Sequence, residues 1–340
     1  MIRYFGRKLL TMAGTLAIVS ALVFFIINLP PGDFISNQIA TLQASGEEGS
    51  IAKAQFLREQ YALDKPLWQQ YFIWVGVMPG ANGFSGLLQG DFGWSFEFDR
   101  PVTEVLGESI WLTIIVNFAA ILFIYAVALP LGVIAAVYAG RWLDYVIAFV
   151  GYIGLATPNF LLALLLLYYG RIYLGLPIGG LMDPVYENQP WTWDKVQSVL
   201  AHLIIPTIVI GTSGTASMIR RLRANMLDEM HKPYVTTAKA KGLGPTQRLV
   251  RYPLRAALNP FVADIGNLLP SLISGSVLVS AVLSLPTLGP VLLDALRSQD
   301  TYLAGFILLF ASALTLVGML ISDLLLALLD PRIRFGDRAR

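Results

Sequence analysis

The residues that could carry catalysis or bind a metal are few in this sequence. The chain has 340 residues, no Cys and two His, His202 and His231, so thiol chemistry is excluded and a histidine-based metal site lacks ligands. No G-x-x-x-x-G-K-[ST] or H-E-x-x-H stretch occurs, and "GTSGT" at 211–215 departs from the nucleophile elbow at Thr215. We expect no enzyme activity and no cofactor in this chain, although an intramembrane enzyme built on Asp and Ser is an alternative. The small residues of 211–217 suit close helix packing.

Polar side chains inside apolar stretches are the next candidates, because burying them in hydrocarbon is costly. Asp264 and Asp323 lie in two such stretches near many Arg residues. They can form ion pairs that hold a helix end, which we favour, or serve as a relay for protons or substrate. Asn117 and Asn159 suit hydrogen bonds between helices, and Asn159 is also a candidate substrate contact.

Hydroxyl groups interrupt one of the apolar stretches, "SLISGSVLVSAVLSLPTLGP" at 271–290. Ser276, Ser280 and Ser284 follow one another at intervals of four residues, which places them on one face of a helix. Such a face can line a polar pathway or pack closely on another helix. We favour the pathway, with these three serines and Asn159 as its candidate residues.

A polar segment of a different kind, "KPYVTTAKAKGLGPTQRLVRYPLR" at 232–255, carries six Lys or Arg and no acid. Its pattern predicts a break at Pro233, two turns of helix over 234–241, a sharp turn at Gly242 and Gly244, and a new helix starting at Pro245. We interpret it as a docking element. A basic loop that fixes topology or contacts anionic lipid would explain the charge, but not the glycine break.

The elements that must position these residues are apolar helices. Hydrophobic residues make up 56% of the chain and charged residues 14%, where a soluble domain carries about a quarter charged residues. Stretches long enough to cross a bilayer lie at about 9–29, 111–139, 145–169, 199–219, 262–284 and 302–329. The first could be a signal peptide, but its apolar core is long and no cleavage site follows closely, so we expect it to be retained.

The distribution of cations predicts the orientation. With the N-terminus inside, 17 of the 24 Lys and Arg fall in cytoplasmic segments and 7 outside. We therefore predict an all-α integral membrane protein with six transmembrane helices and both termini cytoplasmic. The outer region 30–110 holds ten acids against four cations, and "AKAQFLREQYAL" at 52–63 predicts a short helix there. This region forms an ordered extracytoplasmic subdomain or a mobile loop, and we favour the subdomain.

The docking segment resembles a known motif. "YVTTAKAKGLGPTQRLVRYPLRAALNP" at 234–260 looks like the cytoplasmic motif of ABC-importer permeases, in the version of the dipeptide/oligopeptide/nickel permease family. The general motif has Glu-Ala-Ala, which falls on Thr236, Thr237 and Ala238 when its Gly is placed on Gly242. Thr in place of Glu is usual for this branch, whose pattern is close to "TAKAKGL" at 237–243. Further matching segments follow in order along the chain: "LPPGD" at 29–33, "YALDKPLWQQYFIW" at 61–74, "GDFGWS" at 90–95, "TPNFLLALLL" at 157–166 and "LLDPRIRFG" at 328–336.

The resemblance implies a type I ABC importer permease fold in a bacterial inner membrane. The chain would act with a second homologous permease, two ABC ATPases that bind ATP and Mg, and an external solute-binding protein, within the lipid bilayer and without nucleic acid. A short helix would sit in a groove of the ATPase. The resemblance implies that the ATPase is contacted by Tyr234, Thr236, Thr237, Ala238 and Leu243. It also implies that Lys239 and Lys241 face acids of the ATPase and that Gly242 and Gly244 form the bend.

The resemblance makes short oligopeptides the expected cargo. Members of this family commonly carry Glu in the fifth span, where this chain has Ser280, and Thr287 stands within the Pro-Gly-Leu-Gly that follows. A hydroxyl suits a neutral solute, so an oligosaccharide is the close alternative. An ATP-independent transporter or channel is the rival class, but it would often show inverted repeats and broken spans. We predict four parts of the chain: the N-terminal tail and first span at 1–29, the extracytoplasmic subdomain at 30–110, a five-helix membrane core at 111–329 that includes the cytoplasmic segment 220–255, and a cytoplasmic tail at 330–340.

Overall fold

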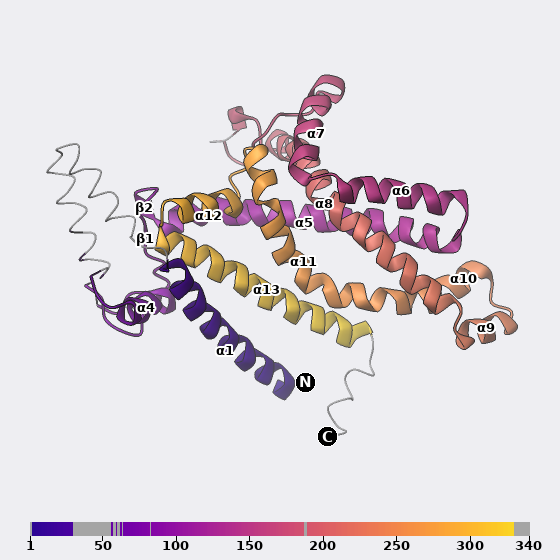
Figure 1. Ribbon diagram of the computed structural model, residues 1–340, viewed down its shortest axis with the longest axis horizontal. Coiled ribbons are helices and arrows are strands. Elements are labelled where there is room, and N and C mark those ends of the chain that lie inside the picture. Colours follow the sequence, from indigo (N-terminus) through magenta and orange to yellow (C-terminus); the bar gives the residue numbers. More distant parts are fainter. Residues whose placement is uncertain are drawn as a thin grey trace. The chain divides into compact units, whose positions relative to one another are not determined.

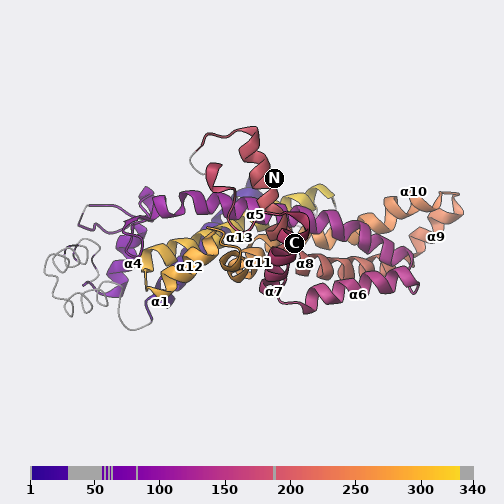
Figure 2. The ribbon, with the colours of Figure 1, turned by 90° about the horizontal axis from the view of Figure 1, so that it is seen from above.

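The structure, a computed structural model, describes residues 2–29, 56, 59, 62, 64–81, 83–186 and 189–329, without the side chains of 2–5, 108, 263–275 and 327–329. Within these residues the chain is helical apart from one short hairpin (Figures 1 and 2). The longer elements are α1 (Ile2–Ile27), α4 (Leu67–Val75), α5 (Val102–Val137), α6 (Trp142–Ala156), α7 (Asn159–Leu174), α8 (Trp193–Met230), α9 (Pro233–Ala240), α11 (Arg255–Val282), α12 (Leu288–Arg297) and α13 (Thr301–Leu329). The shorter ones are η1 (Leu87–Gln89), β1 (Trp94–Ser95), β2 (Arg100–Pro101), η2 (Pro184–Tyr186), α10 (Pro245–Leu249) and η3 (Val250–Leu254). Most of the helix expected at 52–63 lies outside the described residues.

The chain divides into two units that are described separately. Unit 1 comprises residues 1–111 and 287–314, and unit 2 comprises 112–286 and 315–340. Residues 287–314 thus group with the N-terminal part of the chain. The predicted outer region 30–110 and core 111–329 stay predictions.

Unit 1 is held together by a buried carboxylate. Asp300 has no exposed surface, and it precedes α13, where its Oδ1 accepts a hydrogen bond from the amide of Leu303 at 3.2 Å. Its Oδ2 accepts bonds from Ser95 Oγ at 2.7 Å and from the amide of Glu97 at 3.1 Å. One side chain thus caps α13 and fixes the turn between β1 and β2. Apolar residues complete this core: Val102, Val105, Leu106, Leu288, Ala295, Leu303, Ala304 and Ile307.

Unit 2 is built on close contacts of α8 with α5 and α6. A Cβ placed on Gly211 would lie 2.5 Å from Cδ1 of Phe123, and one on Gly214 would lie 2.7 Å from Cδ1 of Ile124. The expectation that the small residues of 211–217 permit close packing is confirmed. In both views α9 and α10 lie at the end of the unit where α8 ends and α11 begins, away from α7 (Figures 1 and 2).

Four helices of the described chain are long and apolar enough to cross a membrane: α1, α5, α8 and α13. The predicted span 145–169 is not one straight helix, because α6 and α7 meet at an angle of 102°. Pro158 explains the break, since it lacks an amide hydrogen and moves Thr157 into extended geometry (φ −80°, ψ 121°). The pair counts as a fifth span if it crosses once. Much of α11 consists of residues whose side chains are not described, so the predicted six spans are not tested.

The return from α10 to α11 is helical throughout. Asn259 and Pro260 lie inside α11. An irregularity occurs earlier, in η3, which is a π-helical turn containing Pro253. A proline without an amide hydrogen favours such a widened turn. Helical backbone therefore continues from Pro245 to Val282.

Candidate functional site

The predicted docking segment starts where α8 ends. Lys232 is extended (φ −74°, ψ 149°), and Pro233 is the first residue of α9. A proline suits this position, because the first amide groups of a helix have no partner within it, and the residue before proline favours extended geometry. The predicted break at Pro233 and the helix over 234–241 are confirmed.

A single carboxylate joins α9 to the end of α8. Glu229 lies in the last turn of α8, with 17% of its side chain exposed. Tyr234 donates its hydroxyl hydrogen to Oε2 of Glu229, and Lys232 donates from Nζ to Oε1. We call Glu229 with these two donors the Glu229 clamp. Both carboxylate oxygens are engaged, so the clamp ties the start of α9 to α8.

The clamp changes the acidity of its members. Burial alone would raise the pKa of Glu229, but the hydrogen bonds from Lys232 and Tyr234 outweigh it and hold the pKa below its usual range. Burial, together with the hydrogen bond to Glu229, raises the pKa of Tyr234 to about 12. At neutral pH the carboxylate is therefore ionised and the phenol is a donor, which is the pairing that the geometry requires.

One face of α9 packs on its own chain and the other is exposed. Val235 and Ala238 have only 9% and 3% of their surface exposed. Ala238 was expected to contact the ATPase; its side chain is covered by its own chain in this structure, and its role as a contact residue stays a prediction. The other expected contact residues of α9 are exposed: Tyr234, Thr236, Thr237 and Lys239, with Lys241 directly after the helix.

The turn after α9 depends on one glycine. Gly242 has φ +79°, the left-handed region, and a Cβ there would meet no atom within 4 Å. Glycine is thus needed for its conformation and not for space. Gly244 is extended (φ −61°, ψ 155°), which any residue can adopt. The expectation that both glycines set the bend is correct for Gly242 and wrong for Gly244. Leu243 between them is half-buried.

The candidate pathway residues do not share one surface. Ser276 and Ser280 in α11 are 5% and 0% exposed, which fits packing within unit 2. Ser284 follows the end of α11 at Val282 and has φ +51°, so it does not continue the helical face. Asn159 is half-buried in the first turn of α7. The pathway role of these four residues stays a prediction, and the side chain of Asp264 lies outside the described residues.

The sequence reasoning missed a second ion pair near this end of unit 2. Arg223 in α8 donates from Nε and Nη2 to the two oxygens of Asp144 in α6, both at 2.6 Å. The amide of Gly140 also donates to Asp144, at 2.9 Å, and the Asp144 side chain is 6% exposed. A two-pronged Arg–carboxylate pair fixes geometry as well as position. Asp144, a lone acid at the start of an apolar stretch, was the feature of the sequence that could have indicated this pair.

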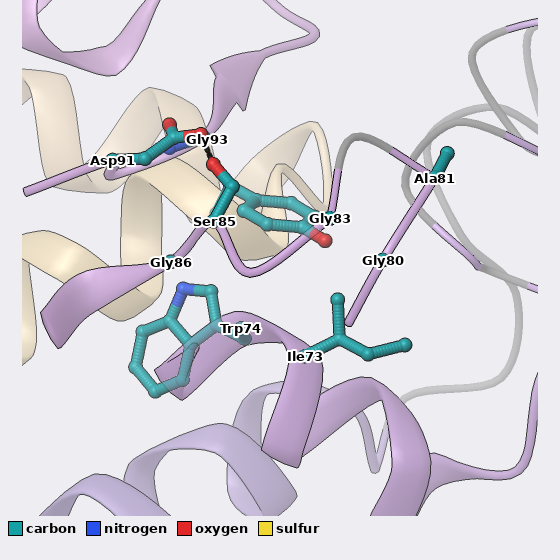
Figure 3. A pocket seen from close by; sticks show the side chains of 10 residues that line it. Ile73, Trp74, Gly80, Ala81, Gly83, Ser85, Gly86, Asp91 and Gly93 are labelled. Atoms are coloured by element: carbon teal, nitrogen blue, oxygen red, sulfur yellow. Dashed lines mark hydrogen bonds between the residues drawn. The ribbon is translucent and has the colours of Figure 1, made fainter. Parts of the chain in front are cut away.

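A small cavity in unit 1 is a poor substrate site. It measures about 60 Å³ and lies between Ile73, Trp74 and the segment 80–93 (Figure 3). Ser85 donates a hydrogen bond to Asp91 at its edge. This segment packs closely on the end of α4, since a Cβ on Gly86 would lie 2.5 Å from the amide nitrogen of Gly76. The volume suits water molecules beside the buried indole of Trp74, and nothing larger.

The exposed face of α9 offers hydroxyl and ammonium groups for contacts and presents no arrangement for catalysis. Among the residues that the structure describes, no three His, Asp or Glu side chains gather in a group able to hold a metal ion. What the geometry can do is receive a partner on one face while the Glu229 clamp carries any displacement of α9 into α8.

Comparisons with known protein families agree over most of the sequence. Residues 128–335 match the model described as "Binding-protein-dependent transport system inner membrane component", and residues 1–117 match the N-terminal model of the same class. An oligopeptide transport system permease protein, AppB of Bacillus subtilis, is 32% identical over 337 residues, which cover 98% of this chain and all of the relative. A glutathione transport system permease protein, GsiC of Escherichia coli K12, is 31% identical over 340 residues, covering 98% of this chain and all of that protein.

A solved structure shares the fold. A chain of the MetNI methionine ABC transporter in an inward-facing conformation superposes with a TM-score of 0.52 at 18% identity. The match covers 67% of this chain and 97% of that one.

Proposed function

Because the chain belongs to the binding-protein-dependent transport system inner membrane components, as an ABC-importer permease of the dipeptide/oligopeptide family, we propose that it forms half of the translocation pathway of a type I importer. The other half is a second homologous permease. Two ABC ATPase subunits bind ATP and Mg on the cytoplasmic side, and an external solute-binding protein delivers the cargo. The chain crosses a bacterial inner membrane six times, with both termini in the cytoplasm.

The observation that carries the proposal is the geometry of α9. This two-turn helix buries Val235 and Ala238 against its own chain and leaves Thr236 and Lys239 on the open side. An apolar face that is already covered positions the helix, and the exposed polar face then receives the ATPase. A like arrangement on a stand-alone channel would have no partner to contact.

Helix α8 is the lever that transmits the motion. It runs without interruption from Trp193 to Met230, a length of about 57 Å at 1.5 Å per residue. The Glu229 clamp fixes α9 to one end of it. When ATP draws the two ATPases together, α9 moves with its groove, and a rigid α8 passes the displacement to the opposite side of the membrane.

We propose short peptides as the cargo. The relatives are named for oligopeptide and glutathione transport. The serine that raised the possibility of an oligosaccharide, Ser280, has no exposed surface in this structure. It therefore offers no hydroxyl to a sugar in this conformation, and the case for a neutral cargo loses its main support.

The experiment is uptake by the reconstituted importer with a variant of the open face of α9. Thr236→Arg places a long cation where the ATPase groove would lie, and Thr103→Arg makes the same change at an exposed position of α5 in unit 1. We expect Thr236→Arg to abolish copurification of the ATPase and ATP-dependent peptide uptake, while Thr103→Arg retains both. Uptake by this chain without ATP, or equal behaviour of the two variants, would contradict the proposal.

A further inference from the structure

A cavity of unit 2 lies at the end of the unit opposite α9. It has a volume of about 710 Å³, within the range of pockets that hold small ligands. Its walls come from the end of α7, the following loop, the first turns of α8 and the residues after α11. By the distribution of cations this end is extracytoplasmic, so the cavity faces the side from which cargo arrives.

The loop that forms one wall is fixed in place. Gly179 and Gly180 have φ +62° and +72°, conformations that favour glycine. The amide of Gly180 donates to the carbonyl of Leu283 at 3.0 Å, and a Cβ on Gly179 would lie 3.0 Å from that same oxygen. The loop is therefore tied to the end of α11. Ser284, the next residue, lines the cavity and is exposed.

A carboxylate backed by a buried imidazole stands on the wall formed by this loop and α8. The amide of Asp183 donates to Ser198 Oγ at 2.9 Å, which anchors the residue, while 60% of its side chain stays exposed. His202 is 7% exposed. Its Nδ1 lies 2.7 Å from the carbonyl of Ser198 and must carry the hydrogen, because a carbonyl only accepts. Nε2 then lies 4.0 Å from Oδ1 of Asp183, beyond a hydrogen bond.

A cation lies on the wall formed by α7. Arg171 lies in the last turn of α7 and is exposed. In the part of the chain that the structure describes, its guanidinium makes no ion pair. The cavity thus presents an exposed carboxylate at Asp183 and an exposed guanidinium at Arg171, and apolar residues such as Leu167 and Val282 also line it.

We propose that this cavity is an entry subsite for a zwitterionic oligopeptide, with Asp183 receiving the free α-amino group and Arg171 the free α-carboxylate. The inference rests on the proposed function and specifies its cargo. Fixed opposite charges favour a ligand that carries both complementary charges and disfavour one that leaves them desolvated and unpaired. A neutral saccharide would leave both unpaired.

The test uses the complete importer, with its ATPases and binding protein, in proteoliposomes. Uptake is measured for a tripeptide with both termini free, for its N-acetylated form and for its C-amidated form. We expect Asp183→Asn to lower uptake of the free peptide about tenfold, as loss of one charge interaction worth roughly 1.4 kcal/mol predicts, and to leave uptake of the acetylated peptide unchanged. Arg171→Gln should likewise lower uptake of the free peptide about tenfold and leave uptake of the C-amidated peptide unchanged.

The comparison isolates this chain from the binding protein. Because the binding protein is the same in all arms, its own preference cancels when the ratio of free to blocked peptide is compared between variants. Asp194→Asn and Arg297→Gln are matched controls, since both residues are exposed and neither lines the cavity. They should retain the wild-type ratios.

The outcomes separate the two proposals. Absence of ATP-dependent peptide uptake by the wild-type importer would contradict the proposed function. Robust uptake with wild-type ratios in Asp183→Asn and Arg171→Gln would overturn the entry subsite and leave the proposed function intact. If the variants differ from wild type only in vesicles containing phosphatidylethanolamine, and not in phosphatidylglycerol alone, the cavity holds a zwitterionic lipid headgroup and the peptide subsite is wrong.

Discussion

The hydroxyl of Tyr234, the second residue of α9, donates its hydrogen to the carboxylate of Glu229 in the last turn of α8. This bond to a charged acceptor joins α8 and α9, which His231 and Lys232 separate along the chain. Such bonds contribute about 1.5–3 kcal/mol, less where water competes, and Tyr234 is 37% exposed. Single substitutions can therefore test this connection.

Tyr234→Phe removes the bond and keeps the ring. Without the hydroxyl, α9 can shift in its groove while α8 stays behind, so ATP hydrolysis should continue with severalfold lower peptide uptake per ATP. The measurement is uptake and phosphate release on the same proteoliposomes. Tyr252→Phe is the matched control, because its ring lies 6.2 Å from that of Tyr234. Equal loss in both variants would show that the effect does not depend on the bond to Glu229 and would contradict the role of the clamp.

The Glu229 clamp should also give the protein a pH dependence at the acid end. Because the hydrogen bonds from Lys232 and Tyr234 hold the pKa of Glu229 below its usual range, its ionised form stabilises the folded state. That stabilisation is fully present above the unfolded-state pKa of about 4.3 and is lost as the pH falls through the lower folded-state pKa.

Thermal unfolding of the purified chain across this acid range checks the effect. Wild type should lose more stability on acidification than Glu229→Gln, which has no ionised form to lose. Asp228→Asn, at the exposed neighbouring position, should follow the wild-type curve. A Glu229→Gln curve parallel to wild type would show that this carboxylate contributes nothing to the pH dependence.

The two glycines after α9 should respond differently to alanine. Gly242→Ala places a Cβ on a left-handed backbone, at a cost of about 1–2 kcal/mol, although space is available. Gly244→Ala introduces no strain, because that residue is extended. We expect a lower thermal midpoint and reduced uptake for Gly242→Ala and wild-type values for Gly244→Ala. The reverse order would mean that the turn is set elsewhere.

Helix packing in unit 2 predicts a large effect at Gly211. An added Cβ would approach the Phe123 ring to 2.5 Å, and overpacking of this kind costs about 1–3 kcal/mol. Gly211→Ala should therefore lower the thermal midpoint, and Phe123→Leu in the same chain should restore part of the loss. Gly107→Ala, where nothing lies within 4 Å, should be neutral or mildly stabilising. A tolerated Gly211→Ala would contradict the close α5–α8 contact.

Local signals in the sequence were sufficient wherever one residue determines the backbone. Pro233 starts α9 and Gly242 ends its turn, as predicted, because proline and glycine restrict or permit conformation regardless of distant contacts. The same rule applies at Pro158: the apolar pattern of 145–169 predicts one straight span, and the proline breaks it into α6 and α7. Local backbone restriction by proline overrides the apolar pattern there.

Contacts between distant residues were beyond the reach of the sequence. The small side chain of Ala238 indicated a face that something approaches closely, but not that its own chain is the neighbour. Asp144 and Arg223 are separated by 79 positions, and Asp300 and Ser95 by 205. Such pairs appear only once helices are placed side by side, and they explain why residues 287–314 group with the N-terminal part of the chain.

The central claim, that the exposed face of α9 is the docking surface for an ATPase, is tested most directly by cross-linking. The chain has no cysteine, so single cysteines at Lys239 and, as a control, at Thr103 can be joined to cysteines around the ATPase groove. We predict cross-links from position 239 whose yield changes when ATP is added, and none from position 103. No cross-link from position 239 in an importer active in ATP-dependent uptake would contradict the account.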